Sequence, residues 1–376
     1  MTQQTKSELI RHYCKEYKRV SKSGKGQILQ ALTELTGYSR KHLIHALNRR
    51  VEIPKKVSRK RVSRYQPVVG HLERLWAAGN CLCGKRLQPF LPKLLDSLRR
   101  HNEIEVTQQE ESLLLSISAA TIDRLLVHAR KDLVPRGRST TKPGTLLKHK
   151  IAIRTANDWD DKRPGFFEID LVAHCGDSTR GEYINTLDIT DVATGWTVCV
   201  PFMGRSERFC VEAIKKARQA VPFTMLGIDS DNGSEFINAH LKRYCQRNDL
   251  WFTRSRPYKK NDQCRVEQKN WDVVRKTVGY ARFDSPQQLD LLEQIYGVLA
   301  FYQNYFQPSQ KLVEKQRIGA RVTKKYDTAA TPYERLLSHP DVAENTKDWL
   351  RQLYQELNPA QLLRTIQQLV VTLCNL

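Results

Sequence analysis

Hydrophobic positions recur with a helical period in the first 50 residues. One predicted helix face is formed by residues at i, i+3, i+4 and i+7, namely Ile28, Ala31, Leu32 and Leu35. Gly37 can end this helix, and Ser39 can cap a second helix over 39–47. Arg40 and Lys41 would then lie at the N-terminal end of the second helix, the end that meets base edges in helix-turn-helix modules. Residues 1–50 therefore predict a helix-turn-helix DNA-binding module, with a plain helical packing unit as the alternative.

The next 105 residues alternate between basic, helical and irregular stretches. Residues 51–65 read as a basic linker laid along phosphates or free in solvent, with cations at Lys55, Lys56, Arg59, Lys60 and Arg61. Residues 66–133 are largely helical, with a capped helix expected from Ser118. They predict a second helical DNA-binding module or a packing unit. Residues 134–155 mix Pro, Gly and small polar residues, which indicates a linker.

Strand patterns begin at about residue 156. The predicted strands are 166–172, 183–190, 196–200, 224–228 and 250–253. The predicted helices are 209–217, 235–246, 262–283 and 287–306. Three strands followed by alternating helices and strands predict a mixed α/β domain over 156–306. Residues 307–376 are expected to form a basic and helical C-terminal region. Its basic stretch at Arg317, Arg321, Lys324 and Lys325 is either a further DNA contact or a solvated face.

Charge separates the two halves of the chain. Of 376 residues with a net charge of +22, residues 1–150 hold 31 Lys and Arg against 12 Asp and Glu, and the remainder is nearly balanced. A basic region of this kind indicates a polyanionic partner, most commonly nucleic acid, whereas a solvated basic surface is the alternative. No stretch of 18 apolar residues and no apolar leader occurs, so we expect a cytoplasmic protein without a membrane role. The nine cysteines are odd in number and irregularly spaced, which argues against a disulfide framework and against structural zinc.

Three acidic residues are candidates for metal binding. Asp170 interrupts an apolar strand, where a carboxylate is costly unless it is paired or metal-bound. Asp231 follows a predicted strand and precedes Gly233, and Glu267 lies on a predicted helix. Two divalent ions held by such oxygen ligands can activate a nucleophile and stabilise a leaving group in phosphodiester chemistry. Asp188, Asp191 and Asp229 lie near the same strands and compete for this role.

The chain resembles the DDE family of insertion-sequence transposases and retroviral integrases over roughly 160–306. The resemblance is carried by Phe167-Glu168-Ile169-Asp170, by Asp231-Asn232-Gly233-Ser234-Glu235-Phe236, and by Glu267, with 35 residues between Asp231 and Glu267. It implies an RNase H-like catalytic core and two Mg²⁺ or Mn²⁺ ions held by catalytic Asp170, Asp231 and Glu267. It also implies a nucleoid-associated homo-multimer that acts on double-stranded DNA, both transposon ends and target. The family often places a basic residue two turns after the Glu, where this chain has Val274.

Further DNA contacts are expected beside these acids. The residues concerned are Arg254, Arg256, Lys259, Lys260 and Asn270. A plain surface position is the alternative for Asn270. His174, four residues after Asp170, could approach the site or merely pack.

Three functions fit these patterns. The first is a transposase that cleaves transposon ends and transfers the strand into target DNA. The second is a hydrolytic nuclease with the same fold, and the third is a DNA-binding regulator with an inactive core. The complete acid trio favours an enzyme over the regulator.

Overall fold

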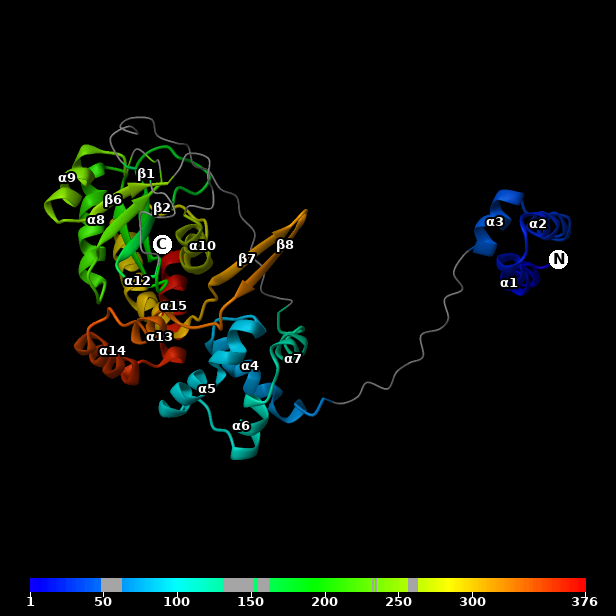
Figure 1. The fold of residues 1–376 in the computed structure, drawn as a ribbon, viewed down its shortest axis with the longest axis horizontal. Helices are drawn as coiled ribbons and strands as arrows, with labels where there is room; N and C mark the ends of the chain where they lie inside the picture. The colour runs from blue at the N-terminus through cyan, green and yellow to red at the C-terminus, as the bar shows by residue number, and fades with distance from the viewer. Residues whose placement is uncertain (49–62, 131–151, 154–161, 232, 234, 256–262) are drawn as a thin grey trace. The chain divides into compact units, whose positions relative to one another are not determined.

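The chain forms two compact units, Met1–Ser63 and Arg64–Leu376 (Figure 1). The computed structural model describes residues 1–48, 63–130, 152–153, 162–231, 233, 235–255 and 263–376. The predicted segments 66–133, 156–306 and 307–376 thus contribute to one unit rather than to three.

The N-terminal unit is a cluster of three helices. These are α1 (Gln3–Arg19), α2 (Lys22–Thr36) and α3 (Arg40–Asn48). Gly37 ends α2 with a φ of 70°, a conformation that suits glycine, and the Ser39 hydroxyl accepts the N–H of His42 at 3.3 Å. The predicted helix boundaries are therefore confirmed. The buried face of α2 is rotated from the predicted one, because Leu29 and Leu32 enter the core while Leu35 is 53% exposed.

A six-stranded mixed sheet lies at the centre of the second unit. Its order is β1-β6-β5-β2-β3-β4, in which β2, β3 and β4 pair antiparallel and β5 and β6 continue parallel to β2. The strands are β1 (Ala152–Ile153), β2 (Phe166–Ala173), β3 (Ile184–Asp191), β4 (Thr197–Met203), β5 (Gly227–Ser230) and β6 (Trp251–Arg254). The mixed α/β prediction is confirmed.

Helices follow the strands much as predicted. They are α8 (Glu207–Ala220), α9 (Ala239–Arg247), α10 (Cys264–Lys269), the π-helix η2 (Asn270–Arg275), α11 (Lys276–Val278) and α12 (Pro286–Phe306). The prediction that a helix starts at Glu235 was wrong. The side chain of Asn238 accepts the N–H of Leu241 at 2.8 Å, so this residue caps α9 and the helix begins later.

Helices that precede the sheet share its hydrophobic core. They are the short η1 (Gln66–Val68), α4 (Val69–Ala78), α5 (Gly84–Arg100), α6 (Gln108–Leu115) and α7 (Ala119–Leu125). The Tyr302 hydroxyl of α12 donates to the Ala78 carbonyl at 2.6 Å, which ties α4 to the centre of the unit. These helices pack into the same core as the sheet, and their DNA-binding role stays a prediction.

The C-terminal region contains a β-hairpin that the sequence did not predict. Strands β7 (Leu312–Ile318) and β8 (Arg321–Tyr326) form a separate two-stranded sheet. Helices α13 (Pro332–Leu337), α14 (Glu344–Glu356) and α15 (Pro359–Cys374) follow, and α15 packs on α12. Across the described residues, none of the helices has the length and apolar character to cross a bilayer.

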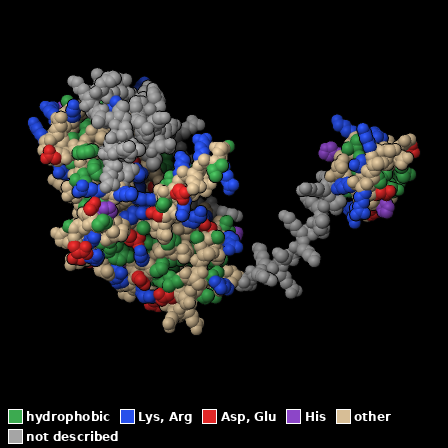
Figure 2. Space-filling model, viewed as in Figure 1, with side chains coloured by type: hydrophobic (Ala, Val, Ile, Leu, Met, Phe, Trp, Pro, Cys, Tyr) green, Lys and Arg blue, Asp and Glu red, His purple; other side chains and the backbone are tan. Residues whose placement is uncertain are grey.

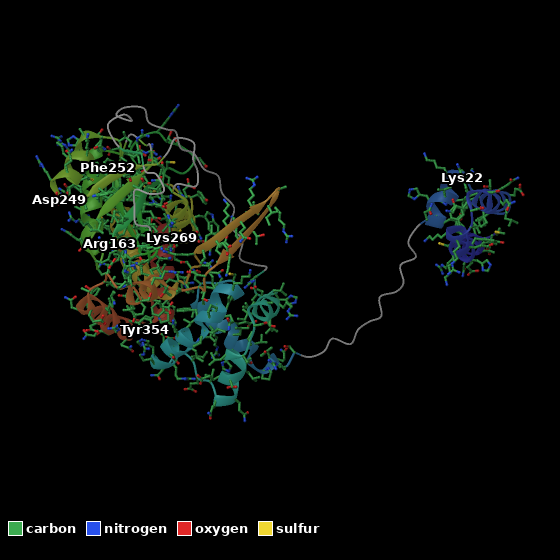
Figure 3. The ribbon with its side chains drawn as sticks, viewed as in Figure 1. Lys22, Arg163, Asp249, Phe252, Lys269 and Tyr354 are labelled. Carbon is green, nitrogen blue, oxygen red and sulfur yellow. The ribbon has the colours of Figure 1, made fainter. Side chains whose placement is uncertain are left out.

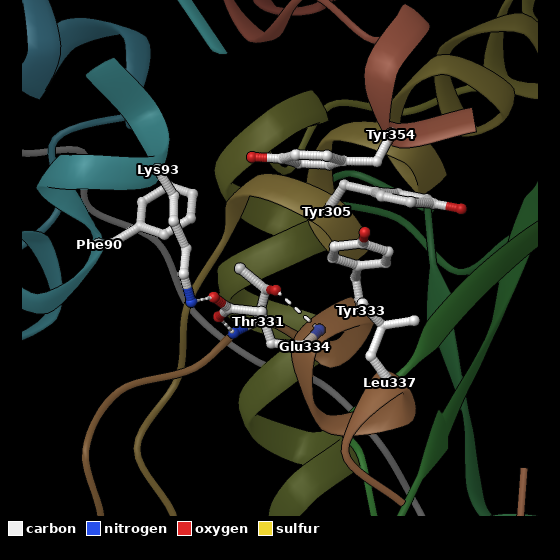
Figure 4. A pocket seen from close by; sticks show the side chains of 8 residues that line it. All are labelled: Phe90, Lys93, Tyr305, Thr331, Tyr333, Glu334, Leu337 and Tyr354. Atoms are coloured by element: carbon white, nitrogen blue, oxygen red, sulfur yellow. Dashed lines mark hydrogen bonds and ion pairs between the residues drawn. The ribbon is translucent and has the colours of Figure 1, made fainter. Parts of the chain in front are cut away.

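A cavity of about 260 Å³ lies where four helices meet (Figure 4). Tyr333 and Tyr354 stack at 4.9 Å between ring centroids, and Tyr305 stacks on Tyr333 at 5.0 Å. Lys93 of α5 forms an ion pair with Glu334 of α13. Stacked aromatic rings and this ion pair join the preceding helices to the C-terminal ones, so the cavity is a gap in a packing interface.

Candidate active site

Acidic side chains gather on one face of the sheet. Because alternate residues of a strand share a face, Glu168 and Asp170 of β2 point the same way. Asp229 lies opposite Glu168 in β5, and Asp188 lies opposite Asp170 in β3. Helix α10 packs on β2 and β3. The site is therefore built from carboxyl groups between the middle of the sheet and one short helix.

Glu168 attaches α10 to the sheet. Its fully buried carboxylate accepts the backbone N–H groups of Arg265 and Val266 at 3.0 and 3.1 Å. The Arg265 guanidinium adds an ion pair at 3.0 Å. A carboxylate at a helix N-terminus satisfies free N–H groups and is stabilised by the helix dipole. Glu168 thus fixes the start of the helix that carries Glu267.

A second attachment joins α10 to β5. The Gln263 amide donates to the Asp229 carbonyl at 3.1 Å. The Asp229 carboxylate in turn accepts the Thr253 hydroxyl at 2.7 Å. Asp229 is fully buried and its oxygens serve these contacts, so it has a structural role rather than a catalytic one.

Asp170 lies at the centre of the site. One carboxylate oxygen accepts the N–H of Leu171 at 2.8 Å, and the other accepts the Asn270 amide at 2.6 Å. Burial, together with the negative charges of Asp231 and Glu267, raises the pKa of Asp170 to about 7. The negative charges of Asp231 and Glu267 thus act on Asp170, although the three acids are far apart in the chain.

Asp231 follows β5 in a tight turn. Its carboxylate accepts the N–H of Gly233 at 2.8 Å. A Cβ at Gly233 would lie 2.8 Å from that same oxygen, so the turn requires glycine. Burial raises the pKa of Asp231, and the charge of Glu235 raises it further. Glu235 is therefore a fourth acid near the site. From the sequence it was only part of the motif that begins at Asp231 and the first residue of a predicted helix.

Glu267 projects from α10 with an exposed side chain. Within the described part of the chain, no three Asp, Glu, His or Cys side chains are close enough to hold one metal ion. Like charges repel, and Asp170 and Asp231 each bind protein N–H groups instead. The side chains of Asp170, Asp231 and Glu267 offer carboxylate oxygens, which are the ligands that Mg²⁺ and Mn²⁺ prefer. The chemistry of these three residues therefore fits such ions.

Lys269, which ends α10 and is labelled in Figure 3, places a cation near Asp188. Burial raises the pKa of Asp188 to about 8, and the nearby charge of Lys269 opposes this increase. One Asp188 oxygen is buried without a hydrogen-bond partner among the described residues. Asp188 and Lys269 extend the charged site along the face next to Asp170.

No family profile matches this sequence. The chain is 41% identical over 334 residues to the uncharacterized protein y4rM of Sinorhizobium fredii, covering 88% of this chain and 95% of that protein. The chain belongs to the y4rM family. This family membership assigns no activity, because y4rM itself is described as uncharacterized.

Solved structures similar to this y4rM-family protein come from viral integrases. The catalytic core of HTLV-2 integrase, in complex with magnesium, is 14% identical, with 39% of this chain and 90% of that chain covered and a TM-score of 0.30. The core of BIV integrase is 16% identical, with coverages of 45% and 91% and a TM-score of 0.27. The intasome of simian T-cell lymphotropic virus, in complex with PP2A regulatory subunit B56 gamma, is 12% identical, with coverages of 66% and 76% and a TM-score of 0.35.

The structure places the expected DNA contacts of this y4rM-family protein unevenly. Arg40 and Lys41 are exposed at the start of α3. Arg254 ends β6 and is only 6% exposed, and its contact with DNA phosphates stays a prediction. The amide of Asn270 donates to Asp170 instead of facing solvent freely. The remaining expected contacts lie outside the described residues: Lys55, Lys56, Arg59, Lys60, Arg61, Arg256, Lys259 and Lys260.

Two other candidates have structural roles. Asp191 accepts the N–H of Gly165 at 2.8 Å and the N–H of Thr194 at 2.7 Å, which holds the β3–β4 turn. His174 bonds the Thr186 hydroxyl at 2.8 Å, and burial lowers its pKa to about 3. The roles of Glu168 and Gln263 could not be predicted from the sequence. Each depends on a hydrogen bond between residues far apart in the chain, Glu168 with Arg265 and Gln263 with Asp229.

Proposed function

We propose that this protein is a DDE-type DNA transposase, with Asp170, Asp231 and Glu267 as its catalytic acids. The single observation that supports this most is the electrostatic influence of Asp231 and Glu267 on Asp170, which lies in the central strand β2. Two carboxylates that raise the pKa of a third are arranged for a cation rather than for stability. The basic charge of residues 1–150 supports a DNA substrate.

The proposed catalytic unit is an RNase H-like core with two Mg²⁺ or Mn²⁺ ions. When bound, such ions polarise phosphodiester oxygens and lower the pKa of water. Asp170, Asp231 and Glu267 would hold them. Asn270 orients Asp170 through its 2.6 Å hydrogen bond, whereas Glu168 and Gln263 keep α10 and Glu267 in place. Strand cleavage would expose a 3′-hydroxyl, which would attack target DNA.

The N-terminal unit is proposed to bind double-stranded DNA. Its helices α2 and α3 are joined by a Gly37 turn, and the exposed Arg40 and Lys41 begin α3. This arrangement suits a helix whose N-terminal end reads base edges. A multimer on DNA would allow one subunit to bind the end that another subunit cuts.

A strand-transfer assay tests the proposed function. Full-length protein, Mg²⁺ or Mn²⁺, a supercoiled plasmid and a labelled duplex from the DNA flanking its own gene should yield labelled plasmid. Asp231→Asn can still accept the N–H of Gly233, so it should fold, yet lose roughly 100-fold or more of the joining rate. The matched control Asp290→Asn, at an exposed position of α12, should retain it. Shorter fragments without joining would indicate a nuclease, and equal activity of Asp231→Asn would refute the site.

A further inference from the structure

The β7–β8 hairpin projects from the Arg64–Leu376 unit as a two-stranded ribbon (Figure 1). Every residue of both strands is exposed, including Val313 at 65% and Ile318 at 79%. An isolated two-stranded hairpin is only marginally stable in water. A ribbon with two uncovered faces is therefore expected to meet a partner.

The base of the ribbon is firmly attached. The Lys311 ammonium donates to the Val192 carbonyl at 2.9 Å and also to the Ala193 carbonyl. Asp327 accepts the backbone N–H of Lys311 at 2.6 Å and forms an ion pair with Arg335 at 2.8 Å. These contacts join the ribbon to the β3–β4 turn and to α13. The ribbon is thus a fixed arm rather than a loose loop.

Positive charge lies on both faces of this arm, because neighbouring residues of a strand point to opposite faces. The view in Figure 2 shows Lys and Arg side chains gathered over the ribbon. The register pairs Lys315 with Lys324 on one face, and Glu314 with Lys325 on the other. The strands carry a single acid and five cations, Lys315, Arg317, Arg321, Lys324 and Lys325. Among the described residues none of the five has an acidic partner. Two such ribbons would repel one another, so charge favours a polyanion over a second copy of the chain.

We propose that the β7–β8 ribbon is a DNA-binding arm that lies in a groove of the double helix. A seven-residue strand is about 23 Å long, and the major groove, about 12 Å wide, admits a two-stranded β-ribbon. Cations on both faces could then reach the phosphates on either side of the groove. This inference rests on the proposed function, because it assigns part of the DNA contact of the same enzyme.

The test measures how DNA affinity depends on salt. In the full-length protein, all five ribbon cations are changed to Gln, and binding to a labelled 30-bp duplex is measured from about 0.05 to 0.2 M salt. Each phosphate contact contributes about 0.9 to the slope of log K against log salt, so the slope should fall by about 3–4. Affinity at about 0.1 M salt should fall tenfold or more. The five positions are exposed, so the unfolding midpoint should stay unchanged.

Two controls separate the possible failures. Lys215→Gln with Lys216→Gln removes exposed charge from α8 and should lower the slope by less than about one. In the Asp231→Asn background the ribbon substitutions should lower the slope by the same amount, so a catalytically inactive chain still tests the arm. An unchanged slope in the ribbon variant, with DNA still bound, would overturn the arm alone. Loss of self-association without loss of DNA affinity would also overturn it, because the partner would then be a second copy.

Discussion

Replacing Glu168 with Gln should loosen α10 and destabilise the second unit. The fully buried carboxylate accepts two backbone N–H groups and pairs with the Arg265 guanidinium. Gln removes the charge and turns an amide N–H towards one of these donors. Charge-assisted hydrogen bonds contribute about 1.5–3 kcal/mol each, and breaking a buried ion pair costs about 3–5 kcal/mol. Because one hydrogen bond can survive, we expect a loss of about 2–4 kcal/mol in the free energy of unfolding.

Urea unfolding, thermal unfolding and hydrogen exchange measure this effect. The thermal midpoint should fall by about 5–10 °C, and the amides of α10 should exchange faster than in the wild type. Glu212→Gln is the matched control, since Glu212 is 62% exposed and forms an ion pair with the neighbouring Lys215. It should change stability by less than about 0.5 kcal/mol. A Glu168→Gln protein with the wild-type midpoint and wild-type exchange in α10 would refute the attachment of this helix to β2.

Two further perturbations test the packing of the second unit. The Arg364 guanidinium lowers the pKa of Glu103 to about 2, so this interaction stabilises the fold above pH 4.5 and is lost as pH falls towards 2. Arg364 is half exposed, so Glu103→Gln should cost about 1 kcal/mol at pH 7 and less at pH 3, as urea titrations at the two pH values would show. Gly84→Ala would place a Cβ 2.1 Å from the Ala119 carbonyl, where α5 meets α7. It should cost about 1–3 kcal/mol, measured as a lower thermal midpoint, and an unchanged midpoint would contradict this close contact.

Local patterns in the sequence predicted most of the sheet and its helices. The apolar run around Phe167 predicted β2, and the alternation of apolar and polar residues around Leu187 predicted β3. Both patterns arise because these strands are buried in the same core. Boundaries were less predictable where side chains compete for caps. Ser234 and Asn238 are both suitable caps, and the hydrogen bond from Leu241 to Asn238 starts the helix at the second.

The β7–β8 ribbon was not predicted because neither of its faces is buried. Apolar and polar residues alternate along a strand when one of its faces is buried. Neither face of the ribbon over residues 312–326 is buried, so this pattern is absent. A local signal was nevertheless present, since Gly319 directly follows the β-branched Ile318. Its φ of 59° suits the two-residue turn that joins the strands.

The site could be predicted only in part. Asp170, Asp231 and Glu267 were proposed from residue type and from the resemblance to the DDE family, and the structure gives Asp231 and Glu267 an electrostatic influence on Asp170. The role of Glu168 could not be predicted, because it depends on the hydrogen bond that its carboxylate accepts from Arg265 at the start of α10. The burial of Arg254 was not predicted either, because the sequence alone does not show that this end of β6 is covered.

Binding of Mn²⁺ measures the central claim most directly. Full-length protein with a DNA duplex is titrated with Mn²⁺ and followed by electron paramagnetic resonance, which reports free ion. We expect two bound ions per chain in the wild type. At least one should be lost in each of Asp170→Asn, Asp231→Asn and Glu267→Gln, whereas the control Asp290→Asn should lose none. Equal Mn²⁺ binding by the wild type and all three acid variants would contradict it.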